Sequence, residues 1–141
     1  MSTQLPPDAP KRADPQAFRG RSISASLTVN NLEQSAAWYQ NVLGFHVDRR
    51  HERDGKLVAV SFLAGKVRLL LTQDDGSRGD RVKGEGFSLY ITTAQSVDDL
   101  AQRIKERGAT LDMEPTDMHG SRAIRLRDPD GFKYTIASDA G

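Results

Sequence analysis

The sequence carries one order of strand and helix patterns twice, and this internal repeat limits the fold more than any other feature. In the first copy, apolar and polar residues alternate over 23–29, as in a half-buried strand. A helix pattern follows, with Asn30 or Asn31 as its cap and Gly44 at its end. Three strand-like segments then complete the copy: 45–52, 57–64 and 67–73. This order predicts a βαβββ unit.

The second copy follows the same order. Residues 87–91 alternate like a strand, Ser96 and Asp99 resemble a capping box, and Gly108 ends the helix pattern. The remaining strand-like segments are 110–113, 122–127 and 132–138. One such unit is too small for a good core, so two must pack together. The sequence therefore predicts an α+β fold in which two tandem βαβββ units form curved mixed sheets around a cleft.

The chain divides into a tail and one domain. Residues 1–20 hold four of the six prolines and a single aromatic residue, so we expect a flexible N-terminal tail. Residues 21–141 are expected to form a single domain, in which the charged, glycine-rich stretch 74–86 is a linker. The two units that it joins are expected at about 21–73 and 87–138.

Composition excludes several classes of protein. With 20 Lys and Arg against 19 Asp and Glu, the chain has no large basic field, so no nucleic-acid partner is expected. The absence of cysteine excludes disulfides, thiolate metal sites and a cysteine nucleophile. No apolar run is long enough to span a bilayer, so we expect no membrane partner and, by default, a cytoplasmic protein.

Two motifs carry a resemblance to a known superfamily. The segment LEQSAAWYQNVLGF at 32–45 resembles a family helix that ends in "FY..vLGF", and DPDGF at 128–132 resembles the family's "DPDGN" hairpin. With the duplicated βαβββ pattern, the chain resembles the vicinal oxygen chelate superfamily of glyoxalases, bleomycin-resistance proteins and extradiol dioxygenases. The resemblance implies a glyoxalase/bleomycin-resistance-like fold over most of 21–138.

The resemblance also implies where a metal would be bound. Metal-dependent members place His or Glu on the first and last strand of each copy. In this sequence those places fall at Ser24, Leu70, Ser88 and Thr135, with Leu69 as an alternative to Leu70. None of these side chains is an anion or an imidazole, the ligands that Mg²⁺ and first-row metals prefer. No metal or other cofactor is therefore expected.

The three imidazoles offer no obvious replacement. His46 and His51 are five residues apart in one strand pattern, so strict alternation would send them to opposite faces. His119 lies in a loop with Asp117, and two ligands make a weak site. His119 and Glu114 remain weak candidates for acid–base catalysis.

Strand alternation also predicts which residues line the cleft. The larger apolar residues should face the helices, including Ile23, Leu27 and Tyr134, which leaves hydroxyls, cations and a few apolar groups on the concave side. Trp38 and Tyr90 are possible stacking residues. The predicted ligand-binding residues are Ser24, Ser26, Ser61, Arg68, Leu70, Ser88, Tyr90, Arg125, Lys133, Thr135 and Trp38. In the linker, Arg78, Arg81 and Lys83 are either an anion site or simply solvated.

Two functions fit these observations. The first is a metal-free, dimeric protein that binds a small molecule, such as an antibiotic or another aromatic compound, as the resistance-type members of the superfamily do. The alternative is a glyoxalase-type lyase or dioxygenase that holds Zn, Ni, Mn or Fe through non-standard ligands. The resemblance implies a homodimer in both cases. A regulatory or assembly module, with large side chains filling the cleft, is a third option.

Overall fold

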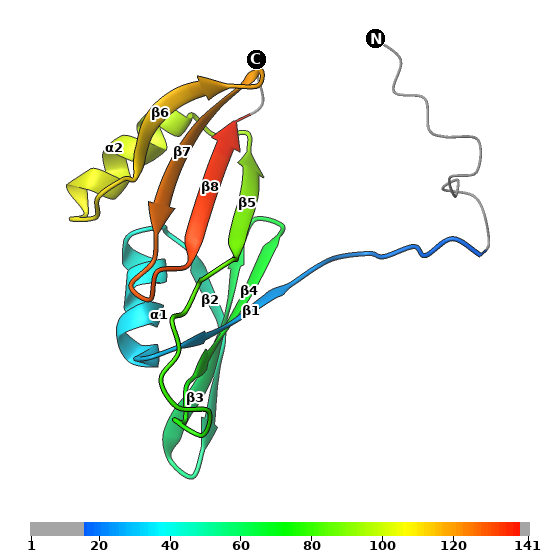
Figure 1. Ribbon diagram of the computed structural model, residues 1–141, viewed down its shortest axis with the longest axis vertical. Helices are drawn as coiled ribbons and strands as arrows, with labels where there is room; N and C mark the ends of the chain where they lie inside the picture. The colour runs from blue at the N-terminus through cyan, green and yellow to red at the C-terminus, as the bar shows by residue number, and fades with distance from the viewer. Residues whose placement is uncertain (1–15, 139–141) are drawn as a thin grey trace.

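The computed structural model describes residues 16–138, and they form two four-stranded sheets with one helix each (Figure 1). The predicted tail falls mostly outside these residues. The first sheet has the strand order β1-β4-β3-β2 and the second has the order β5-β8-β7-β6. In each sheet the first strand pairs in parallel with the last, and the other pairs are antiparallel. The predicted α+β fold of two βαβββ units is confirmed, and the two sheets stay separate.

The first half runs through β1, α1 and three further strands. Its elements are β1 (Ala25–Val29), α1 (Leu32–Asn41), β2 (His46–Arg53), β3 (Lys56–Ala64) and β4 (Val67–Gln73). Asn31 caps α1, since its side chain accepts a hydrogen bond from the Gln34 backbone N–H at 3.1 Å. Gly44 has a φ of 75°, a left-handed conformation that lets the chain leave the helix and start β2.

The second half repeats this order. Its elements are β5 (Ser88–Thr93), α2 (Val97–Glu106), β6 (Met113–Met118), β7 (Ser121–Arg127) and β8 (Lys133–Ser138). Ser96 caps α2 by accepting from the Asp99 backbone N–H at 3.2 Å. Residues 74–87, between the halves, contain no helix or strand. None of the helices between residues 16 and 138 has the length and apolar character needed to cross a bilayer.

Two strand predictions were wrong. The strand expected at 110–113 instead occupies Met113–Met118, although this stretch contains Pro115. Because β6 is an edge strand, a proline can be accommodated, and the pairing with β7 is irregular between Met113 and Thr116. Ile23, expected to cover a helix, lies before β1 and is 90% exposed. The segment from Gln16 to Ser24 instead extends away from the sheets (Figure 1).

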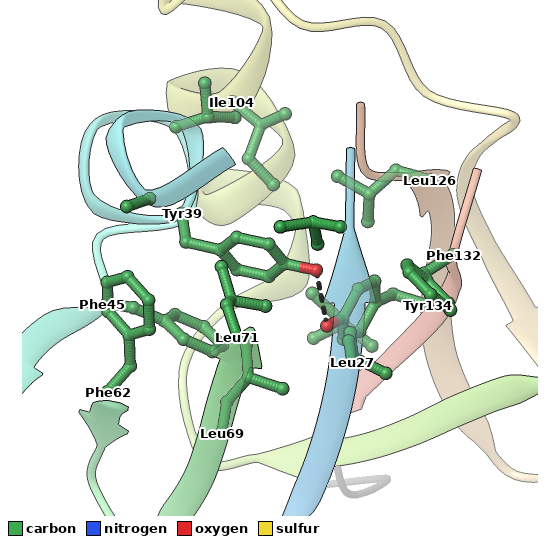
Figure 2. Packing of buried hydrophobic residues seen from close by; sticks show 14 of the residues in the cluster. Leu27, Tyr39, Phe45, Phe62, Leu69, Leu71, Ile104, Leu126, Phe132 and Tyr134 are labelled. Atoms are coloured by element: carbon green, nitrogen blue, oxygen red, sulfur yellow. Dashed lines mark hydrogen bonds between the residues drawn. The ribbon is translucent and has the colours of Figure 1, made fainter. Parts of the chain in front are cut away.

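The two halves share one hydrophobic core on the helix side of the sheets. Leu27, Phe62 and Leu71 of the first half and Ile124 and Leu126 of the second half belong to the same buried cluster. Figure 2 shows Tyr39 of α1 reaching across to Tyr134 of β8, and their rings lie 6.0 Å apart in an edge-on arrangement. The helices therefore cover one face of each sheet, which leaves the opposite face open.

Candidate functional site

The open face of the first sheet carries a row of small, apolar and charged side chains. Ser26 is paired with Leu70, Leu70 with Ser61, and Ser61 with Arg49. Directly paired residues point to the same face, and Leu27, Leu69 and Phe62 are buried on the other face. Arg68 shares the open face, two residues before Leu70 on β4. The strand alternation expected from the sequence is therefore present here.

The open face of the second sheet has an equivalent row. Tyr90 is paired with Thr135, Thr135 with Arg125, and Arg125 with Met113. The next row begins with Ser88, which is paired with Lys133. The neighbouring residues Tyr134 and Ile136 are buried in the core, as alternation requires. These pairings bring together five of the predicted ligand-binding residues: Ser88, Tyr90, Arg125, Lys133 and Thr135.

A β-bulge in β2 places both of its histidines on the open face. His46 is paired with Leu63 and His51 with Ala59, which lie on the same face of β3 as Ser61. The prediction that strict alternation separates His46 from His51 was wrong, because Asp48 is an extra residue that shifts the register. The two histidines are four β3 residues apart, about 13 Å along the strand, which is still too far to share one ion.

A shallow pocket lies between β1 and the segment that joins the two halves. It encloses about 300 Å³ and opens to solvent. Its lining consists of Ser26, Leu27, Thr28, Arg81, Val82, Lys83, Gly84, Glu85, Phe87 and Phe132. Phe87 and Phe132 meet edge to face with ring centroids 6.0 Å apart, and they form its apolar wall. Of the predicted ligand-binding residues, only Ser26 lines this pocket.

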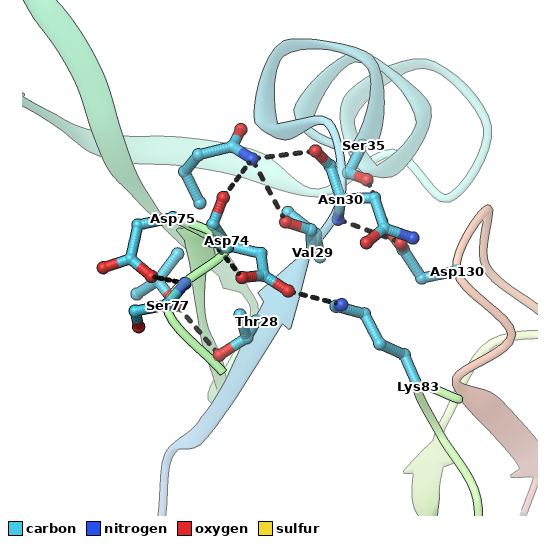
Figure 3. A network of polar contacts seen from close by, with 12 residues as sticks. Thr28, Val29, Asn30, Ser35, Asp74, Asp75, Ser77, Lys83 and Asp130 are labelled. Atoms are coloured by element: carbon cyan, nitrogen blue, oxygen red, sulfur yellow. Dashed lines mark hydrogen bonds and ion pairs between the residues drawn. The ribbon is translucent and has the colours of Figure 1, made fainter. Parts of the chain in front are cut away.

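The joining segment is folded against the rest of the molecule. A Cβ atom on Gly84 would lie 2.5 Å from the carbonyl oxygen of Gly131, so the backbone of the segment contacts the β7–β8 turn directly. Lys83 donates to Asp74 at 2.7 Å, and their side chains are only 7% and 13% exposed (Figure 3). This hydrogen bond from Lys83 is the largest of the interactions that lower the pKa of the Asp74 carboxyl. Arg81 and Lys83 both line the pocket, and the ammonium of Lys83 is bound to Asp74.

The DPDGF motif fastens the β7–β8 turn to the first half. Asp128 accepts from the Tyr39 hydroxyl at 2.6 Å and from the backbone N–H groups of Asp130 and Phe132. Asp130 in turn accepts from the Asn30 N–H at 3.0 Å and from the Ser35 hydroxyl at 3.2 Å. The hydrogen bonds from Tyr39, Asn30 and Ser35 therefore join the halves, and the two backbone hydrogen bonds to Asp128 fix the turn itself.

Burial changes the pKa values of the side chains in this network. Burial raises the pKa of the Asp128 carboxyl, while its hydrogen bonds from Tyr39, Phe132 and Asp130 act in the opposite direction. Burial, with the neighbouring Tyr134 and Asp128, also raises the pKa of the Tyr39 hydroxyl far above its ordinary value. Burial also raises the pKa of the Tyr134 hydroxyl, so both tyrosines stay protonated and can donate within the network.

The remaining predicted residues lie elsewhere. Trp38 packs against the core from α1, so it does not share a face with Tyr90. Ser24 is exposed and precedes β1. His119 has a φ of 51° next to Gly120 in the turn between β6 and β7. Glu114 pairs with Lys105 of α2 at 2.7 Å, five residues from His119 along the chain. The structure thus does not bring His119 and Glu114 together as an acid–base pair.

The positions that would hold a metal in the family do not fit one. Leu70 and Thr135 lie on the open faces of β4 and β8, Ser88 starts β5, and Ser24 stays outside β1. Their side chains supply hydroxyls and a hydrocarbon, with no carboxylate or imidazole among them. In the part of the chain that the structure describes, no group of three or more His, Cys, Asp or Glu side chains is placed to hold an ion.

Sequence reasoning missed several residues of the open surface. Arg49 escaped notice because the bulge at Asp48 could not be recognised from the charged sequence of β2. Val82, Phe87 and Phe132 line the pocket only because the joining segment folds back over β1. Val82, an apolar residue in a stretch otherwise rich in charge, was the one signal in the sequence, and its side chain is exposed in the structure.

Comparisons with known proteins point to one superfamily. The sequence model of the Glyoxalase/Bleomycin resistance protein/Dioxygenase superfamily matches residues 22–136. A lactoylglutathione lyase from Neisseria meningitidis serogroup A is 30% identical over 121 residues, which cover 80% of this chain and 86% of that protein. A lactoylglutathione lyase from Salmonella typhimurium is 25% identical over 130 residues, covering 86% of this chain and 96% of that one.

A solved structure shares the fold. A member of the same superfamily from Sphaerobacter thermophilus superposes with a TM-score of 0.71 at 23% identity. The match covers 86% of this chain and 98% of that chain.

Proposed function

The chain belongs to the Glyoxalase/Bleomycin resistance protein/Dioxygenase superfamily, and from this premise we propose that it binds a small organic molecule on its open sheet faces without a metal ion. The observation that carries the proposal is the donor set at the family's metal positions. Serine, threonine and leucine stand there, and a divalent ion prefers carboxylate and imidazole ligands. The proposed function therefore depends on direct contacts between side chains and ligand.

The chemistry of the open faces suits such a ligand. Each face combines hydroxyls with an apolar side chain and a cation, as in the row of Tyr90, Thr135 and Arg125. Small-molecule sites commonly use a few placed polar groups within apolar surroundings. The pocket beside β1 adds the rings of Phe87 and Phe132. An aromatic compound, including an antibiotic, is the class of ligand that we propose.

We also propose that the protein is a homodimer whose open faces together form the cleft. The outer strands β2 and β6 carry charged residues, and β6 also carries Pro115, features that discourage pairing with another strand. The other two edges, β1 and β5, contain neither charge nor proline. Phe18 and Ile23, which are 95% and 90% exposed, lie in the segment that precedes β1 and would gain cover from a second copy.

Calorimetric titration against a panel of aromatic compounds tests the binding proposal. The panel contains anionic, neutral and cationic members, and each titration is repeated after dialysis against EDTA. We expect at least one compound to bind more tightly than millimolar, with the same affinity before and after dialysis. Binding that disappears with EDTA, or no binding by any compound, would contradict the proposal.

One observation favours a second candidate. The 30% identity to a lactoylglutathione lyase is consistent with a glyoxalase-type lyase, which would hold Zn, Ni, Mn or Fe through ligands other than those at the four family positions. A dioxygenase of the same superfamily would need such a metal as well. Elemental analysis of protein purified without chelators separates the candidates. A near-stoichiometric metal would favour the enzyme and contradict metal-free binding.

A further inference from the structure

We infer that the ligand of the second sheet is an organic anion, whose carboxylate or phosphate is bound by Arg125 and Lys133 while its apolar body lies against Tyr90. This inference rests on the proposed binding function and narrows it to one chemical class. The distribution of charge between the two sides of the sheets carries it.

Basic residues outside the open faces are often paired. Arg50 contacts Glu33 of α1 at 3.1 Å, and Lys105 contacts Glu114 at 2.7 Å. Arg122 is bound by both Asp98 and Asp117, at 2.7 and 3.0 Å. These pairs neutralise the cations that they contain.

Most cationic side chains on the open faces have no acidic partner in the part of the chain that the structure describes. Within residues 16–138, no ion pair involves Arg49, Arg68, Arg125 or Lys133, and all four are exposed. Arg127, the cross-strand partner of Lys133, is the exception, since it pairs with Asp112 at 2.8 Å. The paired rows that hold the four free cations contain no acidic residue. The open faces therefore carry positive charge that the described chain does not compensate.

The second sheet offers the better defined geometry. Tyr90, Thr135 and Arg125 sit on three adjacent strands in one cross-strand row. Directly paired residues are about 5 Å apart, so the ring and the guanidinium are separated by about 10 Å across the row. Lys133 lies two residues from Thr135 on the same face of β8. An aromatic acid of two fused rings matches this spacing.

The chemistry of these groups selects an oxyanion. A guanidinium fork binds the two oxygens of a carboxylate or phosphate, and an ammonium adds a point charge beside it. The Thr135 hydroxyl can donate a further hydrogen bond. Tyr90, which is 65% exposed, offers a ring for stacking. A cationic ligand would instead meet like charges and no carboxylate in this row.

The internal repeat gives the first sheet a related arrangement. Leu70 and Thr135 occupy equivalent places, because Leu70 is paired with Ser26 on β1 and Thr135 with Tyr90 on β5. Arg68 and Lys133 each lie two residues before them. The cation is thus present in both copies, whereas the aromatic ring occurs only in the second. This difference is why we place the ligand on the second sheet.

Calorimetry with matched probes tests the inference. The probes are 1-naphthoate, 1-naphthyl phosphate, 1-naphthamide and 1-naphthylmethylamine, each titrated into the full chain at low ionic strength. We expect at least one anion to bind about tenfold more tightly than the amide, and the amine to bind most weakly. The stronger of the two anions identifies carboxylate or phosphate as the preferred group.

Charge-removing variants locate the site. Arg125→Met should weaken binding of the preferred anion about tenfold and leave binding of the amide unchanged, and Lys133→Met should act in the same direction. Arg103→Met is the matched control, because Arg103 is an exposed arginine on α2. Circular dichroism establishes that all three variants fold.

The outcomes separate this inference from the proposed function. Equal affinity for the amide and the anion, or equal losses from Arg125→Met and Arg103→Met, would overturn the inference while leaving small-molecule binding intact. If Arg125→Met changes the oligomeric mass of the protein in solution but not its affinity for the probes, a second copy covers the open face of the second sheet. The inference is then overturned. If none of the probes binds and the wider panel also fails, both the inference and the proposed function are wrong.

Discussion

At the scale of single residues, the motif side chains of this protein hold the two halves together. Tyr39 and Asp128 come from the two motifs quoted from the sequence, and they meet in a buried hydrogen bond of 2.6 Å. Tyr134 joins them, with its hydroxyl 2.8 Å from that of Tyr39. None of the buried side-chain polar atoms in residues 16–138 lacks a hydrogen-bond partner. A network that is fully satisfied is sensitive to the loss of any member.

Removing one hydroxyl should therefore destabilise the fold. Tyr39→Phe removes the hydroxyl that donates to Asp128 Oδ2 and contacts the Tyr134 hydroxyl, and we expect the free energy of unfolding to fall by about 1–3 kcal/mol. Urea denaturation followed by circular dichroism measures this loss. Tyr90→Phe is the control, since Tyr90 is largely exposed and its variant should stay within about 0.5 kcal/mol of the wild type. Equal effects of the two variants would contradict a structural role for the Tyr39 hydroxyl.

The buried carboxyl should also give stability a pH dependence. Because burial raises the folded-state pKa of Asp128, the folded protein binds this proton more tightly than the unfolded chain does. Its contribution to stability is therefore fully present below about pH 4, the unfolded pKa, and declines as the pH rises through the folded pKa. We expect the stability of the wild type relative to Asp128→Asn to decrease between pH 4 and pH 7.

Urea titrations at several pH values measure this difference. Asp80→Asn, at an exposed position between the halves, is the control for removing one carboxylate from the chain. A difference between the wild type and Asp128→Asn that grows with pH would show that Asp128 favours its charged form in the fold.

At the scale of elements, the segment between the two sheets is part of the structure. Gly84 has a φ of 79° and lies against the carbonyl of Gly131, so neither the conformation nor the space suits a side chain. We expect Gly84→Ala to lower the free energy of unfolding by about 2 kcal/mol or more. Thermal denaturation measures the loss, and it should be accompanied by disorder of the pocket beside β1.

A second glycine separates the cost of the left-handed conformation from the cost of the contact with Gly131. Gly79 has a similar φ of 71°, but a Cβ there would meet nothing within 4 Å. Gly79→Ala should therefore cost only about 1 kcal/mol, the price of the left-handed conformation alone. If the two variants are equally destabilised, the contact between Gly84 and Gly131 contributes little.

The sequence was a good guide to the elements and a poorer one to their irregularities. Alternation, helix caps and glycine stops predicted both βαβββ units, because each depends on interactions within a few residues. The extra residue at Asp48 and the proline in β6 depend instead on what the neighbouring strand accepts. Likewise, nothing in the sequence distinguishes Lys83 from Arg78 and Arg81, and only the folded chain brings it to Asp74.

The same distinction applies to the candidate site. Strand parity placed Ser26, Leu70 and Thr135 on the open faces correctly, since parity is a local property. The pocket beside β1 could not be predicted, because its walls come from β1, the joining segment and the β7–β8 turn. A ligand-binding role for any of these residues stays a prediction.

At the scale of the whole molecule, two similar halves share a core and expose two uncharged strand edges. We expect the wild type to be a dimer and Thr92→Lys, which adds a charge to β5, to shift it toward the monomer. Thr116→Lys is the control, because it lies on β6, an edge that already carries charged residues. Sedimentation equilibrium measures the mass of each. A monomeric wild type, or a dimer indifferent to Thr92→Lys, would contradict association through β5.

The difference between the uncharged edges β1 and β5 and the charged edges β2 and β6 also limits the size of an assembly. Once a single neighbour covers both β1 and β5, the margins that face outward are β2 and β6, whose Arg, Glu and Asp side chains repel a further strand. Association would then close on itself rather than propagate into a filament. A chain with this arrangement can keep two strand edges that are able to pair and still resist fibril formation at high concentration.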